Sequence, residues 1–262
     1  MNIRLFQIDA FSDRLFHGNP AAVCPLTEWL PDELMQQIAM ENNLAETAFF
    51  VKEHDRYVIR WFTPAVEVDL CGHATLASAF VIFHFEHYPN RVITFNSRSG
   101  VLTVTRNGDR LTLNFPADKL EKVSPPEELV SGIGLRPAEC HRGKSDYMLV
   151  YDKPEEIESI RPDMGRIAEV LARGIIVTAP GRDVDFVSRF FAPQSGVPED
   201  PVTGSAHTTL APYWAARLGK NELTAMQLSK RRGWLSCRLA GDRVEISGNA
   251  CAYLTGQIEV EL

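Results

Sequence analysis

Short segments in which hydrophobic and polar residues alternate recur along the chain, and this period of two is typical of strands with one buried face. In the first half such segments cover residues 3–11, 47–52, 57–64, 91–97, 100–106 and 110–115. Two other segments are typical of helices: residues 31–43 open with a proline and two acids, and residues 73–84 are rich in small and apolar residues. The pattern predicts mixed or antiparallel sheets wrapped against a helix, which is an α/β fold.

The second half repeats this order of elements. Strand-like segments cover residues 146–151, 174–180 and 185–193, and helical segments cover residues 163–172 and 205–217. The triplet Phe-Thr-Pro at 62–64 returns as Phe-Ala-Pro at 191–193. Residues 98–113 also align with residues 231–246 without a gap, keeping Arg, Gly, Leu and Gly-Asp-Arg in register. Such an echo indicates an internal duplication, although Gly-Asp is also a common hairpin turn.

We therefore expect two similar α/β domains, residues 1–118 and 119–262, each a curled mixed sheet around a central helix. The segment 116–128, which is rich in proline and charge, marks the boundary between them. A return of the last strand to the first domain remains an open alternative.

The composition is that of an ordinary globular protein of 262 residues, with 45% hydrophobic and 23% charged residues. The apolar runs are shorter than a membrane span and the first residues lack a signal peptide's apolar core, so we expect a cytoplasmic protein with no membrane contact. A formal net charge of −7 argues against a nucleic-acid partner. The five cysteines are widely spaced and form no CxxC motif, and HExxH is absent, so we expect neither a disulfide framework nor a metal site.

The starts of the two similar helices are suited to binding an anion. The residues concerned are Cys71, Gly72 and His73 in the first half and Thr203, Gly204 and Ser205 in the second. The first N–H groups of a helix lack partners within it, the helix dipole adds positive charge, and glycine lets a ligand approach the backbone. Two such starts would hold a small carboxylate substrate. The alternative for Ser205 is a simple N-cap role.

Carboxylates distinguish the two halves. Glu46 stands where a predicted helix gives way to a strand, and the aligned position in the second half is Gly174. Apolar neighbours could bury Glu46 and raise its pKa, which suits a proton shuttle working near neutral pH. An exposed loop acid is the alternative for Glu46, and a structural histidine is the alternative for His73. Asp200 stands just before the second helix start.

Four motifs together are specific: "GNPAAV" at 18–23, "NNLAETAFF" at 42–50, "FTPAVEVDLCGHAT" at 62–75 and "EDPVTGSA" at 199–206. They closely resemble the motifs of the phenazine-biosynthesis PhzF-like proteins, and the resemblance runs from about residue 3 to the C-terminus. It implies the diaminopimelate-epimerase-like fold, with two pseudo-symmetric α/β halves and an active site in the cleft between them.

The resemblance also implies roles for four residues. Glu46 matches the family's acid/base, which moves a proton across the substrate, and His73, Asp200 and Ser205 complete the catalytic set. The characterised phenazine-pathway member of this family isomerises trans-2,3-dihydro-3-hydroxyanthranilate without a metal or organic cofactor. The resemblance also implies a homodimer. We expect a cofactor-independent isomerase of a small conjugated carboxylate that forms a homodimer. The residues expected to contact the substrate are Asn19, Cys71, Gly72, Thr203 and Gly204.

Two alternatives to this function remain open. The related epimerases and racemases use two cysteines, one at each helix start, whereas this chain has Cys71 at the first start and Thr203 at the second. A two-thiol racemase is excluded, because the second position lacks a proton carrier of suitable pKa. A one-base dehydratase or epimerase that uses Cys71 is one alternative, and a protein that binds small anions without catalysis is the other.

Overall fold

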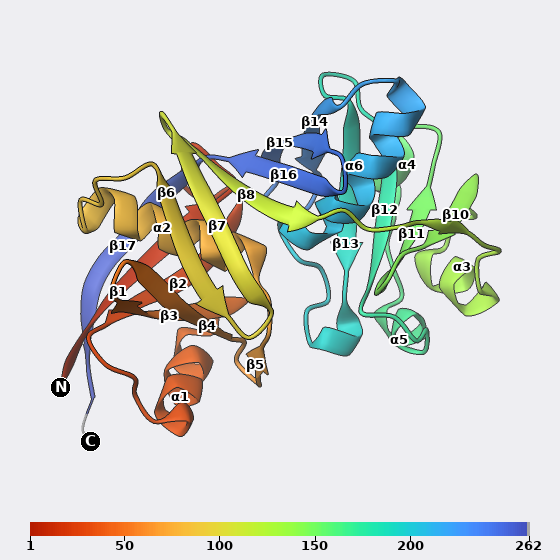
Figure 1. The fold of residues 1–262 in the computed structure, drawn as a ribbon. Helices are drawn as coiled ribbons and strands as arrows, with labels where there is room; N and C mark the ends of the chain where they lie inside the picture. The colour runs from red at the N-terminus through yellow and green to blue at the C-terminus, as the bar shows by residue number, and fades with distance from the viewer. Residues whose placement is uncertain (261–262) are drawn as a thin grey trace. The chain divides into compact units, whose positions relative to one another are not determined.

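A computed structural model describes residues 1–260 of the chain (Figure 1). The chain forms two compact units: Met1–Asn114 together with Ser247–Leu262, and Phe115–Ile246. It enters the second unit within β8 (Arg110–Pro116) and returns to the first within β16 (Arg243–Gly248). The final strand, β17 (Ala250–Glu259), therefore belongs to the same unit as the N-terminal strand.

The strands of the first unit form a mixed sheet. They are β1 (Asn2–Ala10), β2 (Asn19–Leu26), β3 (Glu46–Glu53), β4 (Arg56–Phe62), β5 (Glu67–Val68), β6 (Val92–Ser97), β7 (Gly100–Asn107), β8 and β17. Strand β1 lies between β17 and β2 and is antiparallel to both. From β2 through β3, β4, β6 and β7 to β8, successive neighbours run parallel, antiparallel, parallel, antiparallel and antiparallel.

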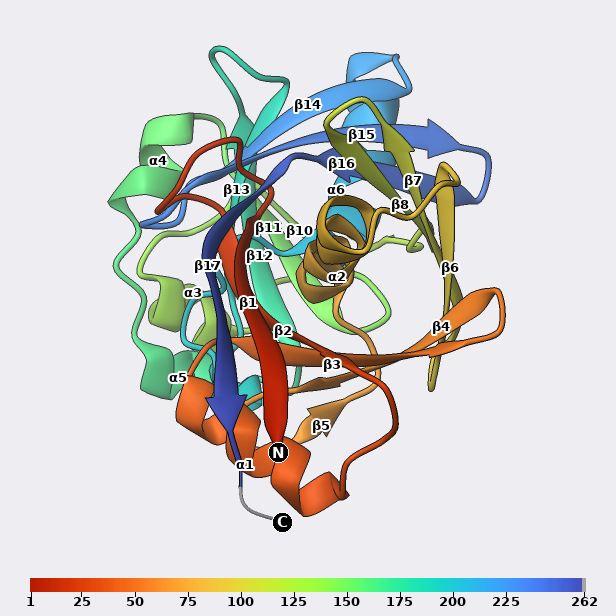
Figure 2. The same cartoon turned by 90° about the vertical axis from the view of Figure 1, so that its left-hand side faces the viewer.

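Helix α2 (Gly72–Phe85) lies at the centre of the first unit, enclosed by its strands (Figure 2). All residues from Gly72 to Phe83 are buried, because small and apolar side chains cover the whole circumference of the helix. Helix α1 (Asp32–Asn42) covers the other face of the sheet, where Met35 packs in one cluster with Phe49 and Phe62. The start of α2 is therefore held rigidly inside the unit.

The second unit repeats the same topology. Its strands are β9 (Glu121–Lys122), β10 (Glu139–Arg142), β11 (Asp146–Val150), β12 (Gly174–Pro180), β13 (Phe186–Phe191), β14 (Glu222–Gln227), β15 (Gly233–Ala240) and β16. From β11 to β15 the neighbours run parallel, antiparallel, parallel and antiparallel, and β16 follows β15. Strands β2, β3, β4, β6, β7 and β8 thus correspond to β11 to β16. The predicted α/β fold with two similar mixed sheets is confirmed.

The aligned hairpins show how the repeated sequence produces repeated structure. The turns of both consist of Gly-Asp alone: Gly108 and Asp109 join β7 to β8, and Gly241 and Asp242 join β15 to β16. Gly108 has φ +61° and Gly241 has φ +63°, a left-handed conformation that glycine adopts without steric cost.

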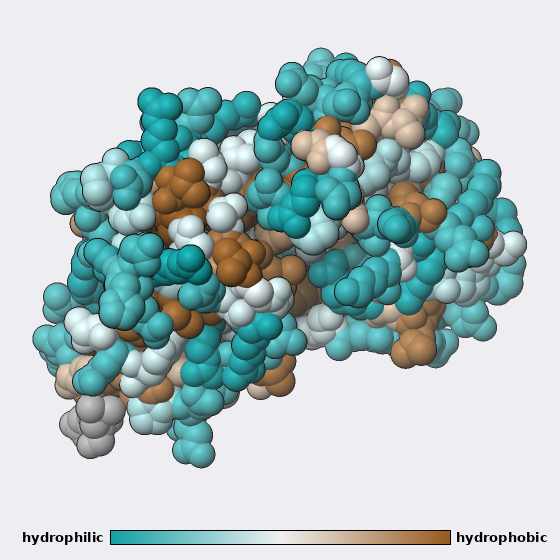
Figure 3. Space-filling model, in the orientation of Figure 1, coloured by the Kyte–Doolittle hydropathy of each residue, from teal (hydrophilic) through white to brown (hydrophobic). Residues whose placement is uncertain are grey.

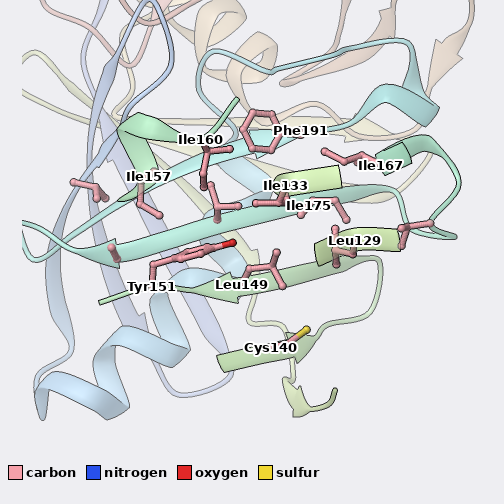
Figure 4. Packing of buried hydrophobic residues seen from close by; sticks show 14 residues of the cluster. Leu129, Ile133, Cys140, Leu149, Tyr151, Ile157, Ile160, Ile167, Ile175 and Phe191 are labelled. Carbon is pink, nitrogen blue, oxygen red and sulfur yellow. The ribbon is translucent and has the colours of Figure 1, made fainter. Parts of the chain in front are cut away.

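Helix α6 (Gly204–Leu218) packs against β14 and β15 in the second unit, as α2 packs against its own sheet in the first. The other face of the second sheet is covered by α3 (Glu127–Ile133), α4 (Pro154–Ser159) and α5 (Met164–Ala168). Figure 4 shows the buried cluster formed there, in which Ile133, Ile157 and Ile167 of these helices face Leu149 and Ile175 of the sheet.

Two of these short helices were not expected, and α5 is shorter than the predicted helix over residues 163–172. Helices of five to seven residues present too few turns for an apolar period to be recognised. They are fixed by local hydrogen bonds instead. Asp163 caps α5 by accepting from the N–H groups of Gly165 and Arg166, and Glu156 accepts from the N–H of Lys153 at the start of α4.

Polar and charged side chains cover most of the face shown in Figure 3, with brown apolar patches over β6 and β7. The exposed apolar residues of these strands are Val92, which is 44% exposed, and Val101, which is 59% exposed. Single exposed apolar residues are usual on protein surfaces. Within residues 1–260, no helix combines the length and the hydropathy that a membrane crossing requires.

Candidate active site

Glu46 and His73 contact each other inside the first unit. Glu46 is the first residue of β3, where it pairs with Ala21 of the parallel strand β2. His73 is the second residue of α2, and its Nε2 lies 3.2 Å from Oε2 of Glu46. The side chains are 5% exposed for His73 and 16% exposed for Glu46. Glu46 is therefore not an exposed loop acid.

The other nitrogen of the His73 ring faces Asn19 and Cys71. Nδ1 of His73 lies 3.1 Å from the amide nitrogen of Asn19 and 3.5 Å from Sγ of Cys71. Because an amide nitrogen can only donate, Nδ1 accepts and the ring proton resides on Nε2, which faces Glu46. Burial lowers the pKa of His73 to about 3, so the ring is neutral near pH 7. A neutral imidazole thus lies 3.2 Å from the carboxylate of Glu46, in a close contact without the geometry of a hydrogen bond.

Asn19 is positioned by a turn that only glycine allows. Gly18 has φ +69°, and a Cβ built on it would lie 2.2 Å from the carbonyl oxygen of Ala10. Asn19 begins β2 directly after this turn, and its side chain is fully buried. The "GNP" segment therefore orients the imidazole of His73 through one hydrogen bond.

Glu46, Cys71 and His73 bring three metal-ligand types within 4.8 Å of one another. Glu46 faces Nε2 of the ring, however, and Cys71 faces Nδ1. One ion bound to His73 would use one ring nitrogen and lie on that side of the ring. Glu46 and Cys71 thus approach the His73 ring at its two different nitrogens.

In the second unit, a hydrogen-bond network fixes the segment that precedes α6. The hydroxyl of Thr203 donates to Oδ2 of Asp200 at 2.5 Å. Gln227, at the end of β14, accepts from the N–H of Thr203 at 2.9 Å and donates to the carbonyl of Asp200 at 2.7 Å and to the Thr203 hydroxyl at 3.1 Å. Gln227 is fully buried. One side chain, remote in sequence, therefore holds both Asp200 and the N-cap of α6 in place.

Glu199 has a different task from its neighbour Asp200. It accepts two hydrogen bonds from the guanidinium of Arg189 on β13, at 2.7 and 3.0 Å. A third nitrogen of Arg189 donates to the carbonyls of Ile157 and Ile160. Arg189 is only 9% exposed. Glu199 is therefore a structural anchor.

Ser205 accepts a hydrogen bond of 2.9 Å from Arg173, whose guanidinium is also held by Asp146 on β11. The N-cap residue of α6 is Thr203, and no side chain caps the helix there. The interpretation of Ser205 as a simple N-cap is therefore wrong, because the residue lies one position inside the helix and its oxygen faces Arg173.

Comparison with known proteins decides the family. The family model described as phenazine biosynthesis-like protein, PhzC-PhzF, matches residues 8–256. The chain belongs to the PhzC-PhzF family. A relative named as an uncharacterized isomerase of Pseudomonas aeruginosa is 51% identical over 99% of this chain and 100% of its own length.

Solved structures agree with this family. A PhzF-family crystal structure from Enterococcus faecalis has a TM-score of 0.97 and 44% identity, covering 99% of this chain and 100% of the other. A hydroxyproline epimerase from Agrobacterium vitis, with trans-4-hydroxy-L-proline bound, has a TM-score of 0.65 and 11% identity, covering 98% of this chain and 92% of the other. At that identity the second likeness shows a shared fold, as the diaminopimelate-epimerase-like resemblance implied.

The residues predicted from the family motifs thus form two groups. The first unit brings together Asn19, Glu46, Cys71, Gly72 and His73, and the second brings together Asp200, Thr203, Gly204 and Ser205. Sequence reasoning missed the polar residues that fix the second group, which are Asp146, Arg173, Arg189 and Gln227. Among these four residues, only Arg173 could have been noticed in the sequence, because it directly precedes Gly174, the position aligned with Glu46.

We expect this family member to lose stability in acid, because it contains two buried histidines. Burial lowers the pKa of His73 to about 3 and that of His207, in the first turn of α6, to about 4. An unfolded histidine has a pKa of about 6.5, so the unfolded state binds more protons below that pH. Each neutral, buried histidine contributes its full share to the free energy of unfolding above about pH 6.5. This contribution decreases as the pH falls towards 4 for His207 and towards 3 for His73, and the loss is roughly 3 kcal/mol for His207.

Urea denaturation from pH 7 to pH 4 measures this dependence. His207→Gln and His73→Gln should each flatten the fall of unfolding free energy with pH, because each removes one group that titrates differently in the two states. A slope as steep in both variants as in the parent protein would contradict the assignment.

Proposed function

We propose that this protein is a cofactor-independent isomerase that moves a proton on a small conjugated carboxylate, in a reaction similar to that of trans-2,3-dihydro-3-hydroxyanthranilate isomerase. The observation that carries the proposal is the pair of Glu46 with a neutral, buried His73 at a separation of 3.2 Å. The isomerase name of the relative and the fold shared with an epimerase support it.

In the proposed reaction Glu46 is the only proton carrier. Its carboxylate takes a proton from a carbon made acidic by conjugation, and the C–H electron pair enters the conjugated system. The resulting Glu46 carboxylic acid then returns the proton to another carbon on the same face, which shifts the double bonds without net oxidation. The ring of His73 packs against the Glu46 carboxylate, and burial keeps this ring from competing for the proton.

The second group of residues binds the substrate in this proposal. Asp200 is held by Thr203 and Gln227, and it accepts donors of the substrate such as an amino or hydroxyl group. Ser205 and the N–H groups at the start of α6 donate to negative charge that develops during transfer.

Cys71 gives the alternative enzyme class a specific test. Its sulfur lies 3.5 Å from Nδ1 of His73, so a thiol base is a chemical possibility. If Cys71 were the base of a dehydratase or epimerase, Cys71→Ala would abolish turnover. If Glu46 is the base, the same variant keeps most of the activity, since the imidazole retains Asn19 as its partner.

Incubation with a panel of conjugated cyclohexadiene carboxylates in deuterated water tests the proposal. We expect the parent protein to convert at least one member to a double-bond isomer, and NMR and mass spectrometry should show that the product keeps hydrogen from the substrate, because Glu46 returns the proton that it removed. Absence of turnover over the panel, with a carboxylate nevertheless bound, would favour a non-catalytic anion-binding protein. Loss of water from the substrate would favour the dehydratase.

A further inference from the structure

Corresponding positions of the two units carry different types of residue. In the first unit, Glu46 at the start of β3 lies beside His73, the second residue of α2. In the second unit, β12 starts at Gly174 and the second residue of α6 is Ser205. A side chain at position 174 has no space, because its Cβ would lie 2.1 Å from the ring of Phe190. The position of the second unit that corresponds to Glu46 therefore carries no acid.

Arg173, the residue immediately before Gly174, places a cation beside the start of β12. Asp146, which pairs with Gly174 and is 3% exposed in its side chain, accepts two hydrogen bonds from the Arg173 guanidinium. Burial opposes the charge on Arg173, but the hydrogen bonds and charge of Asp146 outweigh it and raise the pKa of Arg173. The guanidinium also lies 5.5 Å from the centre of the Phe190 ring. Asp146 and Phe190 thus hold the guanidinium, although the Arg173 side chain remains 42% exposed.

The direction of the hydrogen bond from Arg173 determines what Ser205 does. A guanidinium has five N–H donors and no acceptor, so Oγ of Ser205 accepts at 2.9 Å from Nη1 of Arg173. The O–H of Ser205 consequently cannot donate to Arg173 and must be directed at another acceptor. A hydroxyl that receives a charge-assisted bond is also a stronger donor, since neighbouring hydrogen bonds polarise one another.

We infer that Arg173, held by Asp146, is a positioning residue that makes Ser205 a directed hydrogen-bond donor to the oxyanion of the substrate. Ser205 then donates to negative charge on the bound substrate. This inference rests on the proposed function, and it deepens that function by selecting substrates with a carboxylate or enolate oxygen near Ser205.

A double-mutant cycle tests whether Arg173 acts through Ser205. We expect Ser205→Ala to lower kcat about 100-fold and Arg173→Met to lower it about 10-fold or more, with smaller changes in KM. The double variant should be no slower than Ser205→Ala alone, since Arg173 has lost the group it positions. Arg173→Lys, which keeps the charge without the planar fork, should recover part of the loss. Arg166→Met, at an exposed arginine of the same unit, is the matched control.

Binding separates a failure of this inference from a failure of the proposed function. Calorimetry with an unreactive cyclic carboxylate and its neutral amide should show a preference for the carboxylate that falls at least several-fold in Arg173→Met and in Ser205→Ala. This measurement needs no turnover, so it remains valid if the reaction class is wrong. Additive losses in the double variant, or an unchanged preference for the carboxylate in folded Arg173→Met, would overturn the inference.

Discussion

Replacing Glu46 by glutamine should lower kcat by a factor of about 10³, within the range that general acid–base groups contribute. Glutamine keeps the size of the side chain and its contact with His73. Its neutral amide, however, cannot take a proton from carbon. Ligand affinity and thermal stability should change little, because the contact of 3.2 Å with the imidazole is retained. Formation of the double-bond isomer, followed by NMR, measures the effect.

The matched control is Glu53→Gln, at the exposed opposite end of the same strand β3. It removes one negative charge from the same element and should leave turnover unchanged. A Glu46→Gln variant that is folded and turns over at the rate of the Glu53→Gln control would show that another group carries the proton.

Replacing Arg189 by methionine should cost about 3–5 kcal/mol of unfolding free energy, the range measured when one partner of a buried ion pair is removed. The change leaves the Glu199 carboxylate without its cation and deprives the carbonyls of Ile157 and Ile160 of their donor. Since Glu199 is joined to Asp200, kcat should fall as well. Urea denaturation followed by circular dichroism measures the stability change.

An exposed arginine in the same unit gives the comparison. Arg182 pairs with Glu155 at the surface, with side chains 74% and 48% exposed. Exposed pairs contribute about 0–1 kcal/mol, so Arg182→Met should have a small effect. If Arg189→Met costs no more than Arg182→Met, the Glu199 anchor has been assigned wrongly.

The duplicated fold was predictable from the sequence because its signals are local. Period-two strands, Gly-Asp hairpins and a helix of small and apolar residues each depend on neighbours a few positions away. Their repetition in the same order defined two similar units, and the strand directions of the two sheets confirm that similarity.

The residues that fix the second group were not predictable in the same way. Asp146 lies on β11, Arg173 in the loop before β12, and Ser205 on α6. A hydrogen bond between side chains 27 or 32 positions apart leaves no periodic pattern in one sequence. Gln227 reaches Thr203 from 24 positions away. Tertiary packing alone brings these residues together, so only coordinates distinguish Glu199 as an anchor from Asp200 beside it.

The position of a bound substrate tests the proposed function most directly. A crystal structure of the protein with a bound, unreactive cyclohexadiene carboxylate would locate every group relative to the ligand. We predict a Glu46 oxygen about 3–3.5 Å from the ring carbon that loses its proton. We also predict Ser205 within hydrogen-bond distance of an oxygen of the same ligand molecule. A ligand bound with Glu46 out of reach of its carbons would contradict the proposal.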